Sequence, residues 1–154
     1  WQLRGKREVY VPYNAFSLDS PELRYEDIIQ AGHINPDVTR YELHRVWVVE
    51  ATLKEGERHI YGKRVYFVDE DSWQIMLADH YDGRGEMWRV GEGHLIPFYD
   101  VKVPWLALDT LYDLQNGRYL ASGMRNEERD AIEFGVKAVY ADFTPSALRS
   151  SGVR

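Results

Sequence analysis

The chain has 154 residues, which fits one domain with a substantial core, and no run approaches the roughly 18 apolar residues of a membrane-spanning helix. Its net charge is -6, with Lys and Arg scattered among the acids, which argues against binding to nucleic acid or to an anionic membrane surface. The lack of Cys excludes disulfides and thiolate chemistry, while 11 Tyr and 5 Trp favour strands or a ligand-lined surface.

The first forty residues predict one short strand and one short helix. Residues 1–8 are polar and predict a loose lead-in, and residues 8–16 predict a short strand that Pro12 restricts to a sheet edge or a strand end. Residues 19–22, DSPE, predict a cap and a first helical turn, followed by an amphipathic helix to about residue 32. We expect this helix to cover one face of a sheet.

Residues 40–91 form the centre of the prediction, an antiparallel meander of four strands. The runs are rich in β-branched and aromatic residues and are separated by turn signals. A two-residue turn at Glu55-Gly56 would place Trp47 opposite Arg64. The next two turns would place Tyr66 opposite Ile75, and Leu77 opposite Val90.

Alternation of side chains along these strands gathers three Trp residues on one face. Two interpretations of the Arg residues among them remain open: ion pairs at strand ends with packed aliphatic stems, or polar anchors in a concave apolar cavity. One β-bulge would move part of this set to the other face. The predicted ligand-binding residues are Arg45, Trp47, Arg64, Tyr66, Trp73, Ile75, Leu77 and Trp88.

Beyond the meander the pattern weakens. Residues 91–103 predict a bent strand, and residues 104–108, PWLAL, predict an apolar loop in which Trp105 and Leu106 are lid candidates, with core packing as the alternative. Asn116-Gly117 predicts a hairpin turn, residues 132–143 predict a last strand, and Thr144-Pro145 predicts the start of a short terminal helix.

No motif in the chain predicts catalysis or a bound metal. The five His residues lack compact zinc spacing, and residues 69–71, DED, lack the Gly and the terminal Glu of a calcium loop. There is no P-loop, nucleophile elbow or dinucleotide fingerprint. We therefore predict no enzyme activity, no catalytic residues, no metal and no cofactor.

The run from Gly32 to Val90, together with LYDLQNGRY and the closing DFTPSALRSSGVR, resembles a family of uncharacterised Gram-negative proteins described as outer-membrane lipoprotein-sorting-like. The resemblance covers nearly the whole chain. It implies an α+β fold that is mostly antiparallel β, a curved half-barrel sheet with short covering helices, as in the periplasmic lipoprotein carriers. It also implies that residues 1–154 are a single domain, the C-terminal part of a longer precursor whose signal peptide lies outside this sequence.

The resemblance implies a periplasmic, non-catalytic protein that binds or carries a hydrophobic ligand, such as a lipid or the acyl chains of a lipoprotein. A role in outer-membrane lipoprotein sorting or envelope transport would follow, with an envelope transport protein as a partner. The alternatives are an interaction module that docks on an envelope export complex and, less favoured, an enzyme on a lipid-like substrate. An exposed strand edge could also pair two copies of the chain.

Overall fold

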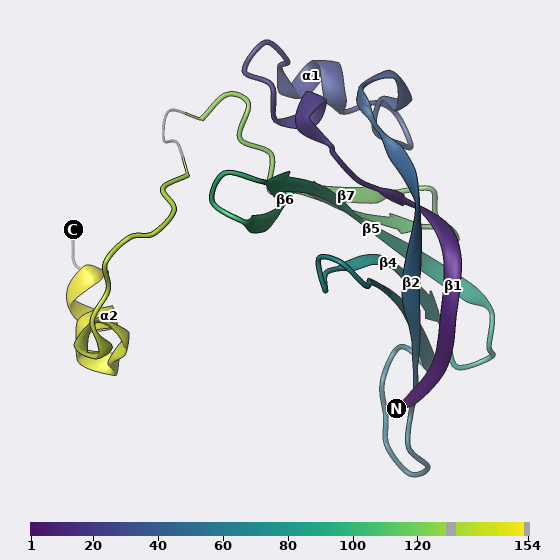
Figure 1. The fold of residues 1–154 in the computed structure, drawn as a ribbon. Helices are drawn as coiled ribbons and strands as arrows, with labels where there is room; N and C mark the ends of the chain where they lie inside the picture. Colours follow the sequence, from purple (N-terminus) through teal and green to yellow (C-terminus); the bar gives the residue numbers. More distant parts are fainter. Residues whose placement is uncertain (129–131, 153–154) are drawn as a thin grey trace.

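A computed structural model describes residues 1–128 and 132–152, and its body is a single curled sheet of seven antiparallel strands (Figure 1). The strands follow one another in sequence order across the sheet. They are β1 (Gln2–Pro12), β2 (Tyr41–Thr52), β3 (Lys63–Asp69), β4 (Ile75–Tyr81), β5 (Met87–Phe98), β6 (Val103–Asp113) and β7 (Tyr119–Ser122). This arrangement confirms the predicted mostly antiparallel α+β fold with an open, curved sheet.

Short helices occupy the one long connection of the sheet and the end of the chain. Between β1 and β2 lie η1 (Phe16–Asp19), α1 (Tyr25–Ile28) and η2 (Pro36–Val38), and after β7 come η3 (Tyr140–Phe143) and α2 (Pro145–Ser151). The amphipathic helix that was predicted to run to about residue 32 is therefore only the single turn of α1. Among the described residues, no helix has the length and apolar character needed to cross a membrane.

The helical connection between β1 and β2 covers one end of the sheet. Leu18 of η1 and Ile28 of α1 are fully buried and pack with Ile34 against Ile96 and Leu108 of the sheet. Each fully buried aliphatic side chain of this kind contributes about 1.5–3 kcal/mol. These contacts confirm the expected covering role of the helix.

A second core shows that the sheet curls onto itself. Val11 of β1 packs with Val46 and Val48 of β2, and also with Met76 of β4 and Leu95 of β5, which lie several strands away in the sheet order. A flat sheet would keep β1 and β5 apart. The curl also brings the segment after β1 beside β5, where the Ala15 amide donates to the Leu95 carbonyl at 2.9 Å.

The expected register between β2 and β3 is wrong by four residues. Trp47 lies opposite Val68 and Arg64 lies opposite Ala51, because the ladder ends where Thr52 pairs with Lys63. The turn at Gly56 does form, but residues 53–62 make a longer loop closed by Leu53, whose amide donates to the Gly62 carbonyl at 2.9 Å. Since the shift is even, every β2 and β3 side chain keeps its predicted face.

The β3–β4 pairing contains the bulge that would alter the face assignment. Val68 pairs with Ile75, but Phe67 pairs with Leu77 and Tyr66 with Ala78, so Met76 is the extra residue. Leu77 therefore shares a face with Phe67, and both pack against the second core. The expected pair of Tyr66 with Ile75 is wrong because the turn is longer than predicted, so that Val68 rather than Tyr66 pairs with Ile75, and because of this bulge. Leu77 lies opposite Glu92 rather than Val90, because a second irregularity, between the His80–Arg89 and Tyr81–Met87 pairs, shifts the β4–β5 register.

Three other segments differ from the sequence-based expectation. Residues 1–8 are not a loose lead-in but the first part of the edge strand β1. Residues 104–108 are not a loop, because they lie within β6. The described part of residues 132–143 contains no strand and ends in η3.

The turn at Asn116-Gly117 and the terminal helix are both confirmed. Gly117 has a φ of 71° in the β6–β7 connection, a left-handed conformation that glycine adopts without strain. Thr144 caps α2 by accepting a hydrogen bond from the Ala147 amide at 3.3 Å. Residues 140–152 lie away from the sheet (Figure 1), and Tyr140 and Phe143 are 93% and 78% exposed.

Candidate functional site

A groove of about 420 Å³ lies where β4, β5 and β6 meet. Its lining contains the apolar side chains Trp73, Ile75 and Leu106, together with Gly91 and Gly93 of β5. The polar residues of the lining are Gln74, Glu92, Asp109 and Thr110. The two glycines give the groove its depth. A Cβ on Gly91 would lie 3.5 Å from the Ala78 Cβ, and one on Gly93 would come within 3.2 Å of Leu106. The volume falls within the roughly 300–1,000 Å³ usual for small-molecule sites.

The groove brings together four of the residues predicted from the sequence. Trp73, Ile75 and Leu77 were predicted to bind a ligand, and Leu106 was a lid candidate; all four line this groove. Trp73 and Ile75 are 69% and 47% exposed, so the groove opens to solvent. A ligand lying in it would cover apolar surface that water now contacts.

Trp73 is held in an unusual conformation at the mouth of the groove. Its φ is 58°, a left-handed value that costs a bulky residue about 1–2 kcal/mol. The Trp73 amide donates to the Asp69 carbonyl at 3.0 Å, and this turn directs the chain into β4. Strained residues of this kind are often found at ligand sites, where the surrounding structure fixes them.

A second group of predicted residues gathers around Tyr61 and His80, apart from the groove lining. The Tyr61 ring lies 4.6 Å from the His80 ring and 5.7 Å from that of Trp88, while Arg64 lies 5.2 Å from the Tyr61 centroid. Tyr66 contacts His80 edge-on at 6.3 Å. The structure thus joins Arg64, Tyr66 and Trp88 through two residues that were not predicted.

An ion pair fixes the inner end of this group. The Asp113 carboxylate accepts hydrogen bonds from Trp88 Nε1 at 2.9 Å and from Arg89 Nε at 3.1 Å, and Arg89 also donates to the Tyr61 hydroxyl at 2.8 Å. Burial opposes ionisation of Asp113, but its hydrogen bonds, with Arg89 first, lower the pKa of the carboxyl below its usual value. Burial and the nearby Arg64 lower the pKa of His80, which is therefore neutral at pH 7.

Arg45 and Trp47 lie apart from both groups. Arg45 Nε donates to Glu70 at 2.6 Å, and the same carboxylate binds Lys6, whose ammonium lies 4.3 Å from the centre of a Trp47 ring. Trp47 alternates along β2 with the buried Val46, so it faces away from the second core. Of the two interpretations of the Arg residues, Arg45 therefore fits the ion pair.

The second lid candidate also lies in β6. Trp105 is 39% exposed, and its ring contacts Phe134 edge-on at 6.4 Å. Phe134 in turn packs on Phe98 at 5.0 Å. Trp105 therefore contacts the segment that follows β7, whereas its neighbour Leu106 lines the groove.

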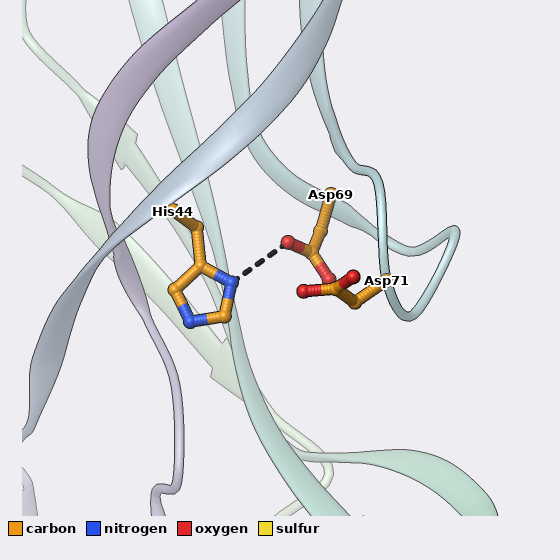
Figure 2. A group of neighbouring side chains, drawn as sticks. All are labelled: His44, Asp69 and Asp71. Carbon is orange, nitrogen blue, oxygen red and sulfur yellow. Dashed lines mark hydrogen bonds and ion pairs between the residues drawn. The ribbon is translucent and has the colours of Figure 1, made fainter.

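A third polar group, formed by His44, Asp69 and Asp71, lies at the β3–β4 turn (Figure 2). Each residue offers one possible metal ligand, and these three atoms lie within 4.8 Å of one another. Sequence reasoning missed this arrangement because His44 and the two aspartates are distant along the chain. The spacing and the ligand types would suit a divalent cation.

The hydrogen bonds of Asp69 give the group a structural explanation. Its fully buried carboxylate accepts from His44 Nδ1 at 2.8 Å, from the Ser72 amide at 2.8 Å and from the Ser72 hydroxyl at 2.7 Å. These bonds shape the turn that carries Trp73. The Tyr13 ring lies 4.1 Å from the ring of His44, and burial together with the charge of Asp69 raises the pKa of Tyr13 to about 12.

Comparison with known proteins gives a relative in Pseudomonas aeruginosa, the uncharacterized protein PA3922. It is 60% identical over 154 residues, which are 100% of this chain but 34% of that protein, so the chain spans about a third of its length. A crystal structure of a proposed outer membrane lipoprotein-sorting protein domain from Vibrio parahaemolyticus is similar with a TM-score of 0.44 and 15% identity. That match covers 86% of this chain and 59% of the other. The family described as Protein of unknown function (DUF1329) matches residues 1–149, and the chain belongs to this family.

Proposed function

We propose that this protein is a periplasmic, non-catalytic binding or carrier protein whose ligand is a hydrophobic chain, such as the acyl chain of a lipid or lipoprotein. The observation that carries the proposal is the groove between β4, β5 and β6, with its glycine floor and the exposed side chains of Trp73 and Ile75. The lipoprotein-sorting-like resemblance of the sequence supports the same class of ligand and the periplasmic location.

The energetics favour a chain that is held reversibly. A fully buried methylene contributes about 0.8 kcal/mol, and a chain in an open groove buries roughly half of its surface. About ten methylenes would then contribute roughly 4 kcal/mol before the entropic cost of association is subtracted. Weak binding of this kind suits a carrier that must release its ligand, and a role in lipoprotein sorting or envelope transport would require a partner that receives it.

A substitution at Gly91 tests the groove, because a side chain there would occupy its floor. In Gly91→Val the new side chain would fill the floor, since a Cβ at Gly91 meets its neighbours only at ordinary contact distances of 3.5 Å and more. The matched control is Gly83→Val in the β4–β5 turn, where a Cβ meets nothing within 4 Å. Neither glycine has a positive φ, so neither substitution strains the backbone.

We expect a fluorescent fatty-acid probe to bind the wild type and the Gly83→Val variant alike, and to bind Gly91→Val about tenfold more weakly. Trp73→Ala should also weaken binding of the probe, because it removes an exposed aromatic side chain from the wall of the groove and leaves the glycines of the floor unchanged. Equal binding by the two valine variants, or no binding by the wild type, would contradict the proposal.

A further inference from the structure

We propose that the loop between β2 and β3 forms a binding site for a phosphate group, in a pocket separate from the apolar groove. The pocket has a volume of about 340 Å³ and is lined by residues of the loop, by the ends of the two strands and by Trp1. The basic residues of its lining are Lys54, Arg58, Lys63 and Arg64, and Glu57 is the acidic residue of the lining. This concentration of positive charge is unexpected in a chain with a net charge of -6.

In the described part of the chain, the cations of the pocket form no ion pair, whereas several other basic residues do. Arg4, Lys6, Arg45, Arg84 and Arg89 each contact a carboxylate at 3.1 Å or less. Within residues 1–128 and 132–152, no carboxylate lies within ion-pair distance of Lys54, Arg58, Lys63 or Arg64. The charges of Lys54, Arg58 and Arg64 are therefore available to an external anion, while that of Lys63 also acts on the nearby carboxyls of Glu50 and Asp79.

Contacts with aromatic rings orient two of these cations. Arg64 Nη2 lies 3.1 Å from His59 Nε2, and its guanidinium lies over the Tyr61 ring. The Lys63 ammonium lies 3.9 Å from the Tyr81 centroid. Aromatic faces hold a cation in place while its charge still acts on an approaching anion.

The base of the loop is fixed, which gives the site a defined shape. The Leu53 amide donates to the Gly62 carbonyl, and the Gly62 amide donates to the Tyr81 carbonyl at 3.0 Å. A Cβ on Gly62 would lie 2.9 Å from the Asp82 carbonyl oxygen, so only glycine permits this close approach. Arg64 therefore starts from a rigid strand end, and Lys54 and Arg58 belong to the loop beside it. The neighbouring Lys63 side chain lies on the opposite face of β3, over Tyr81.

A phosphate group fits this arrangement better than a single carboxylate does. Its several oxygens can accept from more than one cation, and a guanidinium can bind two of them at once. The pocket is roughly ten times the ~30 Å³ that a water molecule occupies in the liquid, so it has room for more than the phosphate itself. Trp1 and Tyr61 line the same pocket and would contact an apolar or aromatic body attached to the phosphate.

The test uses the whole chain and two probes in isothermal titration calorimetry at low salt: inorganic phosphate and monomeric dihexanoyl phosphatidic acid. Arg64→Gln and Lys54→Gln should each reduce the affinity for the bound probe about fivefold, and the double variant should reduce it about twentyfold or more. Lys54→Gln should fold like the wild type, because Lys54 is an exposed loop residue, so a loss of binding in this variant is not caused by misfolding. The control Arg84→Gln, whose guanidinium is paired with Asp82 in another turn, should bind as the wild type does.

The two probes distinguish the sources of the phosphate group. Tighter binding of phosphatidic acid would assign the site to a phosphate carried on an apolar body, and equal binding would assign it to free phosphate. The proposal is overturned if neither probe binds, if Arg64→Gln and Lys54→Gln bind like the wild type, or if dihexanoyl phosphatidylcholine binds as tightly as phosphatidic acid. Gly91→Val should leave phosphate binding unchanged, so the proposals for this site and for the groove are tested independently.

Discussion

The buried carboxylate of Asp69 should be the most sensitive polar group in the β3–β4 turn. Three hydrogen bonds converge on it, from His44, from the Ser72 amide and from the Ser72 hydroxyl, at 2.7–2.8 Å. A hydrogen bond to a charged group contributes about 1.5–3 kcal/mol when its donor is poorly hydrated. His44 and Ser72 are only partly buried, so water could accept hydrogen bonds from them once the carboxylate is removed and would offset part of the lost free energy.

We therefore expect Asp69→Ala to reduce the free energy of unfolding by about 3–5 kcal/mol, the cost usual for removing one partner of a buried polar pair. Asp69→Asn keeps the size of the side chain but replaces one acceptor oxygen by a donor, and about 2–3 kcal/mol should be lost. Asp71→Asn is the matched control: Asp71 is exposed, so the change should stay within about 0.5 kcal/mol.

Urea denaturation followed by tryptophan fluorescence and by circular dichroism measures these differences, and unchanged m-values would show that the unfolding reaction is the same. If Asp69→Asn stays within about 0.5 kcal/mol of the wild type, the turn does not depend on the carboxylate and the structural explanation fails. An equal loss for Asp71→Asn would also refute it, because both carboxylates would then act as one unit, as ligands of a shared cation do.

Three further changes test other parts of the structure. The pKa of His80 is lowered in the folded state, so its contribution to stability should be present at pH 7 and lost as the pH falls below about 6.5; His80→Asn should flatten this part of the stability profile. Gly117→Ala should cost about 1 kcal/mol in chemical denaturation, since the φ of 71° strains alanine. Thr144→Ala removes the cap on the Ala147 amide and should lower the helical signal of α2 in NMR chemical shifts without changing the midpoint of unfolding.

The fold was predictable wherever the sequence carried a local signal. Alternating apolar residues identified the strands of the meander, Asn116-Gly117 identified the β6–β7 turn, and Thr144-Pro145 identified α2. The failures came from segments whose conformation is set by distant contacts. Residues 1–8 are polar and yet pair with β2, because hydrogen bonds along an edge strand need no apolar side chain.

Loop length and the bulge limited the prediction of the site. Gly56 signalled a turn correctly, but nothing local shows that the ladder resumes only at Lys63. The bulge at Met76 leaves no sequence signature, and it places Leu77 opposite Phe67 rather than on the face that carries Tyr66. The predicted residues were therefore divided among the groove, the Tyr61–His80 group and the Arg45–Glu70 ion pair. His44 and Asp69 meet only because β2 pairs with β3, which a search for short metal motifs does not detect.

The distribution of ion pairs determines how the phosphate site should respond to salt. The chain carries a net charge of -6, which acts at long range and repels an approaching anion, while the cations of the loop attract it only at short range. At 0.1 M salt, charges more than about 10 Å apart are largely screened, so added salt first removes the repulsion and weakens the close contacts later. The association rate of phosphate should therefore rise between about 0.01 and 0.1 M salt, although a simple basic surface would show a fall over the same range. A rate that falls throughout this range would refute the reasoning, because the positive charge of the loop would then dominate over the net charge of -6.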